Sequence, residues 1–189
     1  MSRTRAEYYP MAQYLVECGK DGFIAHNVHI RRPYLVSIGS HVNIDWGFYC
    51  TTALVTGDYC HIAPYVVVLG GEKGKLKLGH FCVIGTGSYM ISGSDGLVGA
   101  GLVGPTIPEP YKDDLKIEPI TFENFAGVAT HVVITPGVTL AEGSFIGACS
   151  LVTKDTEPWT IYYGTPAKPV KARKSKTMKE YARKLGYDL

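Results

Sequence analysis

Aliphatic residues recur at every sixth position over the second half of the chain. The series runs without slippage through Phe122, Val128, Ile134, Leu140, Ile146 and Val152. A small or branched residue follows four positions after each of the first five, at Ala126, Val132, Val138, Ser144 and Ser150. A period of six is neither the 3.6-residue repeat of a helix nor the two-residue alternation of a simple strand. It is typical of a parallel β-helix, in which each hexad supplies one short strand and one corner.

A coil built from such hexads is stable only as a stack. Paired strands lie about 4.8 Å apart, so each inward aliphatic side chain touches its equivalent in the next coil. No single repeat can bury its own apolar side, and the open ends of the stack need caps. The pattern therefore predicts an all-β protein, a parallel β-helix of roughly six to seven coils.

The same period governs the first half of the chain, with interruptions. It begins irregularly at Phe23, where Ile24 and Ile30 are expected inward with Val28 and Tyr34 as their partners. A regular series follows at Ile38, Ile44, Cys50, Thr56, Ile62 and Val68, with inward partners Val42, Phe48, Leu54, Cys60 and Val66. After a short glycine-rich excursion at 70–75, the period resumes at Leu78, Ile84 and Met90, with Cys82 and Ser88 inside.

These interruptions divide a single domain, 1–189, into three parts. Residues 1–20 are expected to cap the coil with a short amphipathic helix over 2–18, packed through Tyr14, Leu15 and Cys18. Residues 23–155 form the β-helix, which a long loop without secondary structure of its own interrupts at 91–119; such a loop is usually functional. Residues 156–189 form a turn and a final helix over 175–185, with an expected packing stripe of Met178, Tyr181 and Leu185.

Composition and charge exclude several classes of function. The net charge of +2 is too small to favour a nucleic-acid partner, and no stretch approaches the length of a membrane span. The five cysteines are odd in number and show no CxxC spacing, which favours reduced thiols in a cytoplasmic protein. The first 20 residues lack the apolar stretch of a signal peptide.

Positive charge is concentrated at the C-terminal end. Residues 168–189 contain eight Lys or Arg against Glu180 and Asp188, a local charge of +6, so the rest of the chain carries −4. Two interpretations are open. The segment is either a solvated basic helix, or its first cations face a phosphorylated ligand.

The hexads, the loop and two segments near the C-terminus together resemble a known family. The two segments are ACSLVTKD at 148–155 and YGTPAK at 163–168. They are similar to the hexapeptide-repeat acyltransferases, and the resemblance covers residues 23–173. It implies a left-handed parallel β-helix, an exception to the usual right-handed crossover. It also implies a homotrimer that uses acetyl-coenzyme A (acetyl-CoA).

Further segments resemble one group within that family. They are HIAPYV at 61–66, SGSD at 92–95, GPTIP at 104–108 and EPWTIY at 157–162. The group acetylates sugars in bacterial surface-polysaccharide pathways, such as O-antigen and lipopolysaccharide biosynthesis. Its acceptor is often the amino group of a nucleotide-linked deoxy-aminosugar, and the resemblance implies such a partner here.

The resemblance also implies which residues contact the coenzyme. These residues lie on the wall and corners of the last coils and in the segment after them: Thr130, Ala148, Thr153, Lys154, Lys168 and Lys171. Backbone groups at Thr130 and Ala148 would bond the pantetheine amides, and Lys168 and Lys171 would lie near the phosphates. A strongly anionic ligand on a mildly charged protein needs such cations. No metal is expected.

The transferred proton needs an acceptor, because acyl transfer to a sugar requires a deprotonated nucleophile. Sugar O-acetyltransferases of this family use a histidine in the loop after the middle coils, but the matching stretch at 91–97 offers only Asp95. A hydroxyl needs a base in the transition state, whereas an amine is nucleophilic once its ammonium proton is lost. The missing histidine therefore favours N-acetylation, with Asp95 either the base or a turn residue before Gly96.

Other polar residues at the coil corners are further candidates. His61 is expected to point outward, to solvent or into a neighbouring subunit's active site, where it would contact the substrate or move a proton. His80, at a similar corner, and Tyr65 are candidate substrate contacts. His131 is expected to be a packed surface residue beside Thr130.

Three alternatives stay open at this point. The first is O-acetylation of a hydroxyl on a sugar or polysaccharide. The second is a zinc enzyme like the γ-type carbonic anhydrases, which share this coil and need three converging histidines; here His26 and His29 lie in the first coils, far from the other histidines. The third is a scaffold without activity, which would need neither the long loop nor the cations.

Overall fold

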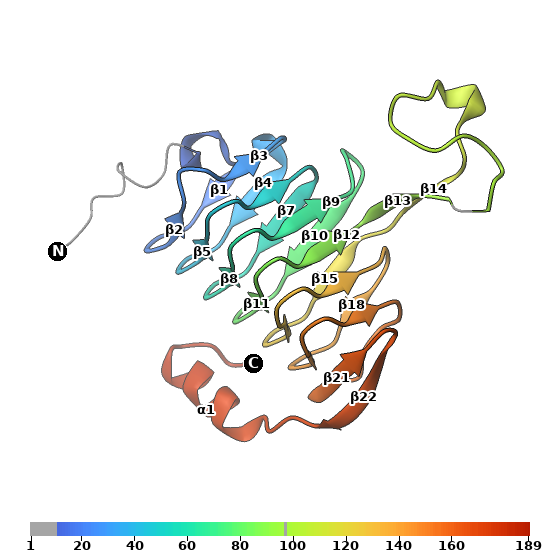
Figure 1. Ribbon diagram of the computed structural model, residues 1–189. Coiled ribbons are helices and arrows are strands. Elements are labelled where there is room, and N and C mark those ends of the chain that lie inside the picture. Colours follow the sequence, from blue (N-terminus) through green and yellow to red (C-terminus); the bar gives the residue numbers. More distant parts are fainter. Residues whose placement is uncertain (1–10, 97) are drawn as a thin grey trace.

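The computed structural model describes residues 11–96 and 98–189, and this part of the chain winds into a parallel β-helix (Figure 1). Its strands form three faces, which we name sheets A, B and C. Sheet A contains β1 (Glu17–Cys18), β4 (Val36–Ile38), β7 (Ala53–Thr56), β10 (Lys75–Leu78), β15 (Ile120–Phe122) and β18 (Thr139–Leu140). Sheet B contains β2 (Phe23–Ile24), β5 (Asn43–Ile44), β8 (His61–Ile62), β11 (Val83–Ile84), β16 (Gly127–Val128), β19 (Phe145–Ile146), β21 (Thr160–Gly164) and β22 (Ala167–Ala172). Sheet C contains β3 (His29–Ile30), β6 (Tyr49–Cys50), β9 (Val67–Leu69), β12 (Tyr89–Ile91), β17 (Val133–Ile134) and β20 (Leu151–Val152).

Each coil passes from sheet B to sheet C to sheet A, so the molecule has three edges where the chain turns. We call these the B–C, C–A and A–B edges. The strands of sheet B number the coils: β2, β5, β8, β11, β16 and β19 open coils 1 to 6, and β21 follows as the start of coil 7. Strands of the six coils pair in parallel, and only β22 runs antiparallel to its neighbour β21 within these three sheets.

The inward positions of the regular hexads are confirmed as the core. Ile44, Ile62, Ile84, Val128 and Ile146 stack in sheet B, each fully buried. The cysteines expected inside are also buried, and burial raises the pKa of Cys50 to about 11, so this thiol is part of the packing.

The irregular first coil departs from the expectation. Tyr34 was expected inward, but its side chain is 59% exposed, and Val36 occupies the core instead. The cause is a 3₁₀ turn, η3 (Pro33–Leu35), which takes the extra residues of this coil out of the wall at the C–A edge. The core period then continues in register.

The prediction of a helix over 2–18 is wrong for the residues of that range that the structure describes. Residues 2–10 lie outside the described residues, and 11–18 form a 3₁₀ turn, η2 (Ala12–Tyr14), followed by strand β1. Tyr14, expected in the packing stripe, is exposed. Strand β1 pairs with β4, because the first strand of sheet A otherwise leaves backbone groups unpaired. A strand therefore caps this sheet.

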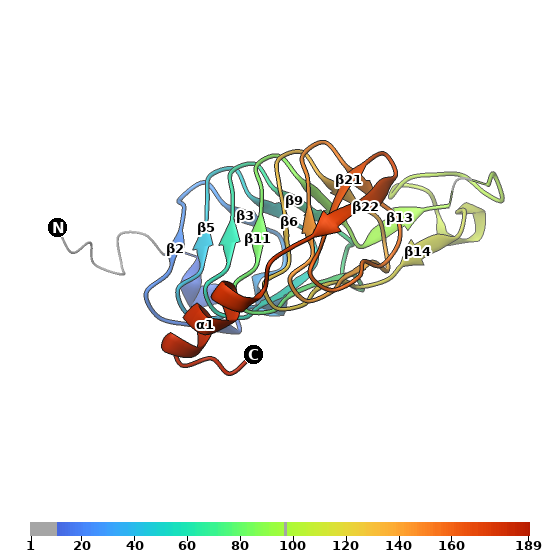
Figure 2. The same cartoon turned by 90° about the horizontal axis from the view of Figure 1, so that it is seen from below.

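The expected loop leaves the coil after β12, but it carries secondary structure. Strands β13 (Gly93–Asp95) and β14 (Leu115–Ile117) pair antiparallel, and a 3₁₀ turn, η4 (Glu109–Tyr111), lies in the segment between them. We name the described residues of 92–119, which are all but residue 97, the arm. It stands off the coil in both views (Figure 1 and Figure 2). Strand β15 then resumes the coil beside β10, so the arm leaves the register of the coil unchanged.

An aromatic ladder follows the A–B edge. His41, Tyr59, Phe81 and Phe125 stack from one coil to the next with ring centroids 4.4 to 5.2 Å apart. All four have positive φ, which non-glycine residues rarely adopt. Trp159 continues the ladder 5.6 Å from Phe125.

The C-terminal segment lies across this ladder. The helix expected over 175–185 is confirmed as α1 (Lys176–Lys184), but its packing stripe is not, since Tyr181 and Leu185 are exposed and Ala182 is buried. The Arg173 guanidinium donates to the carbonyl oxygens of Phe125 and Gly143 at 2.8 and 2.9 Å. Two of the basic residues near the end thus hold the segment in place: Arg173, and Lys179, which pairs with Glu142 at 2.7 Å.

A hydrogen bond anchors the last residues. The Tyr187 hydroxyl donates to Asp58 Oδ2 at 2.7 Å, and its ring contacts the Phe81 ring at 5.2 Å. Burial raises the pKa of Asp58, but hydrogen bonds from Tyr187 and the Ser40 backbone, with nearby His80 and His41, outweigh it and lower that pKa overall. The bond to Asp58 raises the pKa of Tyr187 to about 12. Within the described residues, no helix has the length and apolar content to cross a membrane.

Tyr187→Phe should lower the free energy of unfolding by roughly 1 kcal/mol near neutral pH, since it removes this hydrogen bond. Because the pKa of Asp58 is lowered on folding, the stabilisation is present above its unfolded value of 3.8 and is lost as the pH falls through the folded value. Urea unfolding at about pH 7 and about pH 3 should therefore show a smaller difference from wild type in acid. Tyr181→Phe, at an exposed tyrosine of α1, is the matched control. An equal loss at both pH values would contradict the assignment.

Candidate functional site

The outward side chains of sheets C and A differ in character. The outward column of sheet C is largely apolar: Tyr49, Val67, Tyr89, Val133 and Leu151 follow one another along the axis. The column of sheet A is more polar, with Glu17, Ser37, Val55, Lys77, Thr121 and Thr139. An apolar column on an outer face is unusual for a surface in water and indicates a contact surface.

Thr130 and Ala148 lie one coil apart on the B–C edge. Both are exposed, and the Cys149 N–H donates to the Thr130 carbonyl at 3.0 Å, which fixes the two corners together. Among the described residues, the N–H groups of Thr130 and Ala148 have no hydrogen-bond acceptor. Two free donors about 4.8 Å apart can bind successive carbonyl groups of an extended ligand.

Tyr163 continues this edge in coil 7. Its ring lies over Gly147, and a Cβ at that glycine would collide with the ring, so only glycine permits the contact. The ring is half exposed and forms a flat apolar surface next to Ala148. Lys168 pairs with Tyr163 across the β21–β22 hairpin, which places a cation at the same end of the edge.

The six residues expected at the coenzyme fall into two groups. Thr130, Ala148 and Lys168 lie along the B–C edge, and Lys171 is close by, opposite Ile161 in sheet B. Thr153 and Lys154 lie on the C–A edge, on the far side of strand β20, and both are exposed. Neither Lys168 nor Lys171 forms an ion pair with another described residue. The six residues expected to contact the coenzyme therefore do not lie on a single edge of one chain.

His61 is part of a pair that sequence analysis missed. It points outward from β8, as expected, and its Nε2 lies 2.7 Å from Asp45 Oδ2. The side chains are 45% and 26% exposed. A carboxylate that binds one ring nitrogen fixes the orientation of the imidazole and leaves the other nitrogen as a proton acceptor. The sequence could have predicted this pair, because two residues 16 positions apart fall in adjacent coils of this repeat.

Asp95 lies at the base of the arm, half-buried. It is the last residue of β13 and pairs with Leu115, so it belongs to a strand and is not the turn residue that an Asp-Gly step would suggest. Its position is at the C–A edge of coil 4, whereas His61 lies on sheet B of coil 3. These two candidates therefore lie on different faces of one chain.

The remaining candidates occupy other edges. Tyr65 lies on the B–C edge of coil 3, is 64% exposed and has a ring that packs over Gly47. His80 lies on the A–B edge, where its ring contacts Tyr187 and its Nδ1 accepts from the Asp58 N–H at 3.0 Å. Its contacts are structural, on the edge opposite sheet C. His131 packs over Gly87, as expected for a packed surface residue.

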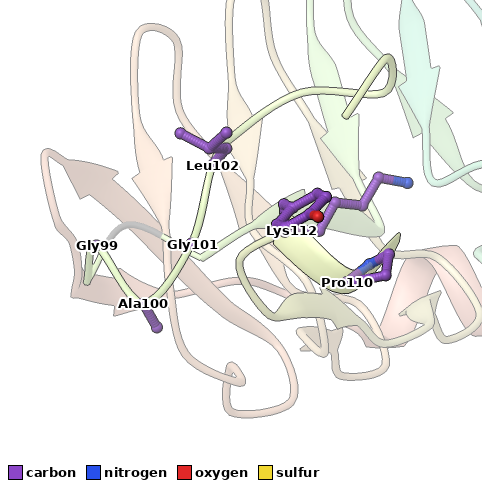
Figure 3. Close-up of a pocket in the computed structure, with 7 residues that line it drawn as sticks. Gly99, Ala100, Gly101, Leu102, Pro110 and Lys112 are labelled. Carbon is purple, nitrogen blue, oxygen red and sulfur yellow. The ribbon is translucent and has the colours of Figure 1, made fainter. Parts of the chain in front are cut away.

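A hollow of about 460 Å³ lies within the arm itself. It is lined by two segments of the arm, Gly99 to Leu102 and Pro110 to Lys112 (Figure 3). None of the residues expected in the site lines this hollow. In the described residues, no three His, Cys, Asp or Glu side chains come together as a metal site would require.

The arrangement separates two functions along one axis. Free N–H donors, an aromatic surface and unpaired cations gather in coils 5 to 7, and can hold an extended anionic ligand. Proton acceptors lie in coils 2 to 4, as the His61–Asp45 pair and Asp95. A group delivered by the first ligand can therefore react with a nucleophile beside the second set.

Comparison with known proteins bears on these features, although no family model matches the chain. The chain is 30% identical over 148 residues to the dTDP-4-amino-4,6-dideoxy-D-glucose acyltransferase of Escherichia coli, which covers 76% of this chain and 74% of that protein. A variant of AntD, an N-acyltransferase from Bacillus cereus, was crystallised with dTDP-4-amino-4,6-dideoxyglucose and coenzyme A. It superposes with a TM-score of 0.88 at 30% identity, over 95% of this chain and 97% of that one.

A more distant structure shares the fold. The hexapeptide-repeat acetyltransferase VCA0836 of Vibrio cholerae superposes with a TM-score of 0.62 at 22% identity, over 93% of this chain and 84% of that one. The left-handed parallel β-helix expected from the sequence is confirmed by these likenesses together with the three parallel sheets.

Proposed function

Because the chain belongs to the hexapeptide-repeat acyltransferases, a family of enzymes, we propose that it acetylates the amino group of a nucleotide-linked amino-deoxysugar. The acyl donor is acetyl-CoA, used as a co-substrate. The observation that carries the proposal is the likeness over nearly the whole chain to an N-acyltransferase that binds both a dTDP-linked amino sugar and coenzyme A. The absence of a histidine from 91–97 favours an amine acceptor over a hydroxyl.

The enzyme works as a homotrimer in this proposal, because the apolar column of sheet C needs cover. With sheet C turned toward a threefold axis, Val67, Val133 and Leu151 are buried between copies. The B–C edge of each copy then lies beside the C–A edge of the next. This arrangement joins Thr130, Ala148, Lys168 and Lys171 of one copy with Thr153 and Lys154 of its neighbour, and so reunites the coenzyme residues that one chain separates.

The same assembly brings the candidate bases together. The arm leaves from the C–A edge at coil 4, so Asp95 of one copy faces sheet B of the next near coils 2 and 3, where Asp45 and His61 lie. In the reaction, Asp95 takes a proton from the acceptor ammonium group. The free amine attacks the thioester carbonyl, a C–N bond forms, the C–S bond breaks, and the coenzyme leaves as a thiol. Tyr65, on the B–C edge of coil 3, is the candidate substrate contact. His80 lies on the A–B edge and plays no part.

The proposal also places the enzyme in the cytoplasm, in the biosynthesis of a surface polysaccharide such as O-antigen or lipopolysaccharide. The support is chemical: nucleotide-linked amino sugars are activated precursors for glycan assembly. Acyl-CoA thioesters are likewise intracellular donors.

The function is tested by incubating the protein with acetyl-CoA and a set of nucleotide-linked sugars. Amino sugars should release coenzyme thiol in equal amount to the amide formed, as followed by a thiol reagent and mass spectrometry. The matching sugars with a hydroxyl in place of the amine should not react. Acetylation of the hydroxyl sugars would replace the proposal with O-acetylation, and the absence of reaction with every sugar would refute it.

Asp95→Asn should lower kcat by about 100-fold if Asp95 is the base, since general base catalysis contributes on this scale. The loss should shrink as the pH rises, because more of the acceptor is then already a free amine. His61→Asn is the comparison variant, and steady-state rates over a pH series measure both. A normal rate for Asp95→Asn with a large loss for His61→Asn would move the base to the His61–Asp45 pair.

Val133→Glu should dissociate the trimer, because it buries a charge at the proposed threefold contact. Light scattering after size-exclusion chromatography should give three times the chain mass for wild type and a smaller mass for the variant. Val55→Glu, at the equivalent outward position of sheet A, is the matched control and should remain trimeric. A monomeric wild type, or an unchanged mass for Val133→Glu, would contradict the arrangement.

A further inference from the structure

The proposed function fixes the direction in which the two ligands lie along the axis. Coenzyme residues occupy coils 5 to 7, and the arm that carries Asp95 leaves at coil 4. The acceptor must therefore approach from coils 1 to 3, with its amine toward the arm and its nucleotide toward the N-terminal end. This inference rests on the proposed function and asks which residues hold the nucleotide end.

The C–A edge of coil 1 presents a basic turn on the side of the molecule from which the arm leaves. The extra residues after β3 form this turn, which includes η3 and joins sheet C to sheet A in coil 1, as the arm does in coil 4. Arg31 and Tyr34 are exposed on it, and Arg32 is half-buried. Neither arginine forms an ion pair with another described residue.

Arg32 is held in place by the next coil. Its Nη1 donates to the Thr51 carbonyl oxygen at 2.7 Å, so the guanidinium reaches from coil 1 toward coil 2 and the arm. A guanidinium has five N–H donors, and the others have no acceptor among the described residues. A fixed fork with free donors is suited to bidentate binding of phosphate oxygens.

At the level of coils 1 and 2, the charged residues of the C–A edge are the two arginines. On the excursion that follows β9, the exposed side chains of Glu72 and Lys73 offset one another. Positive charge therefore lies at the coil 1 to coil 2 level, separate from the cations Lys168 and Lys171 at the other end of the axis. If the reacting groups of two anionic ligands meet at the arm, their phosphates lie at the two opposite ends of the coil axis, beside these two sets of cations.

The length scale agrees with this arrangement. Coil 2, where the Arg32 guanidinium is anchored, and coil 4, where the arm leaves, are two strand spacings or roughly 10 Å apart. That span matches a hexose ring joined to a diphosphate. Tyr34 lies one coil further toward the N-terminus. This residue is 59% exposed, and its ring can stack on a nucleobase.

We infer that the turn Arg31, Arg32 and Tyr34 is the nucleotide subsite of the acceptor. The guanidinium groups bind the diphosphate, and the Tyr34 ring lies against the base. The amino sugar extends from there along the C–A edge to Asp95.

The inference is tested by calorimetric titration with thymidine diphosphate, inorganic pyrophosphate and coenzyme A. Arg32→Ala should raise the Kd of thymidine diphosphate at least tenfold, which corresponds to about 1.4 kcal/mol. It should weaken the binding of pyrophosphate by a similar factor. Arg31→Ala, at an exposed residue, should act in the same direction without affecting the fold. Tyr34→Ala should weaken the binding of thymidine diphosphate several-fold and leave the binding of pyrophosphate unchanged. Coenzyme A should bind every variant as it binds wild type.

Two controls separate this inference from the proposed function. Lys20→Ala removes an exposed cation from the first coils on the A–B edge and should leave all three affinities unchanged. Arg32→Lys, with melting temperature as a check on folding, should recover only part of the affinity, because it keeps the charge but loses the fork. Wild-type binding of thymidine diphosphate by both Arg31→Ala and Arg32→Lys would overturn the subsite while leaving coenzyme binding and the proposed function intact. Failure of wild type to bind coenzyme A would instead refute the proposed function.

Discussion

Contact between equivalent side chains in successive coils is the interaction on which the structure depends. Strands pair about 4.8 Å apart, which is close to the thickness of an aliphatic side chain, so stacked residues fill the interior without gaps. Ile62 and Ile84 are fully buried although their strands are only two residues long. Strands this short cannot be stable alone, and the stack supplies the stability that no single coil has.

The fixed interior determines where the chain can change. An insertion within a strand would move every later residue out of register, whereas an insertion at an edge leaves the pairing intact. The turn after β3, the excursion after β9 and the arm after β12 all leave at the C–A edge, and β4, β10 and β15 resume sheet A in order. The residues that interrupt the hexads between β3 and β15 therefore collect along one edge, beside a coil whose register they leave unchanged.

The spacing of six predicted the core because burial and period are linked through the stack. It failed where a different interaction decides the structure. Tyr34 is exposed because the chain leaves the wall there, and residues 17–18 form a strand because β4 offers unpaired backbone groups. The site was predicted less completely for two reasons. The His61–Asp45 pair depends on contacts between coils. Thr130 and Thr153 lie on different edges of one chain, so their grouping depends on a second copy in the proposed trimer.

In the proposed function one groove serves two large anionic ligands, and the order of their binding residues along the axis explains how this is possible. If their phosphates lay at the same level, repulsion would oppose joint binding, and one set of cations would have to serve both. Here Arg31 and Arg32 lie at one end, Lys168 and Lys171 at the other, and the arm between them. In the proposed arrangement the reacting ends of the ligands, the thioester and the amino group of the sugar, meet at coil 4, away from both sets of phosphates. The stack makes this possible, because it keeps two charged sites several coils apart on one rigid axis.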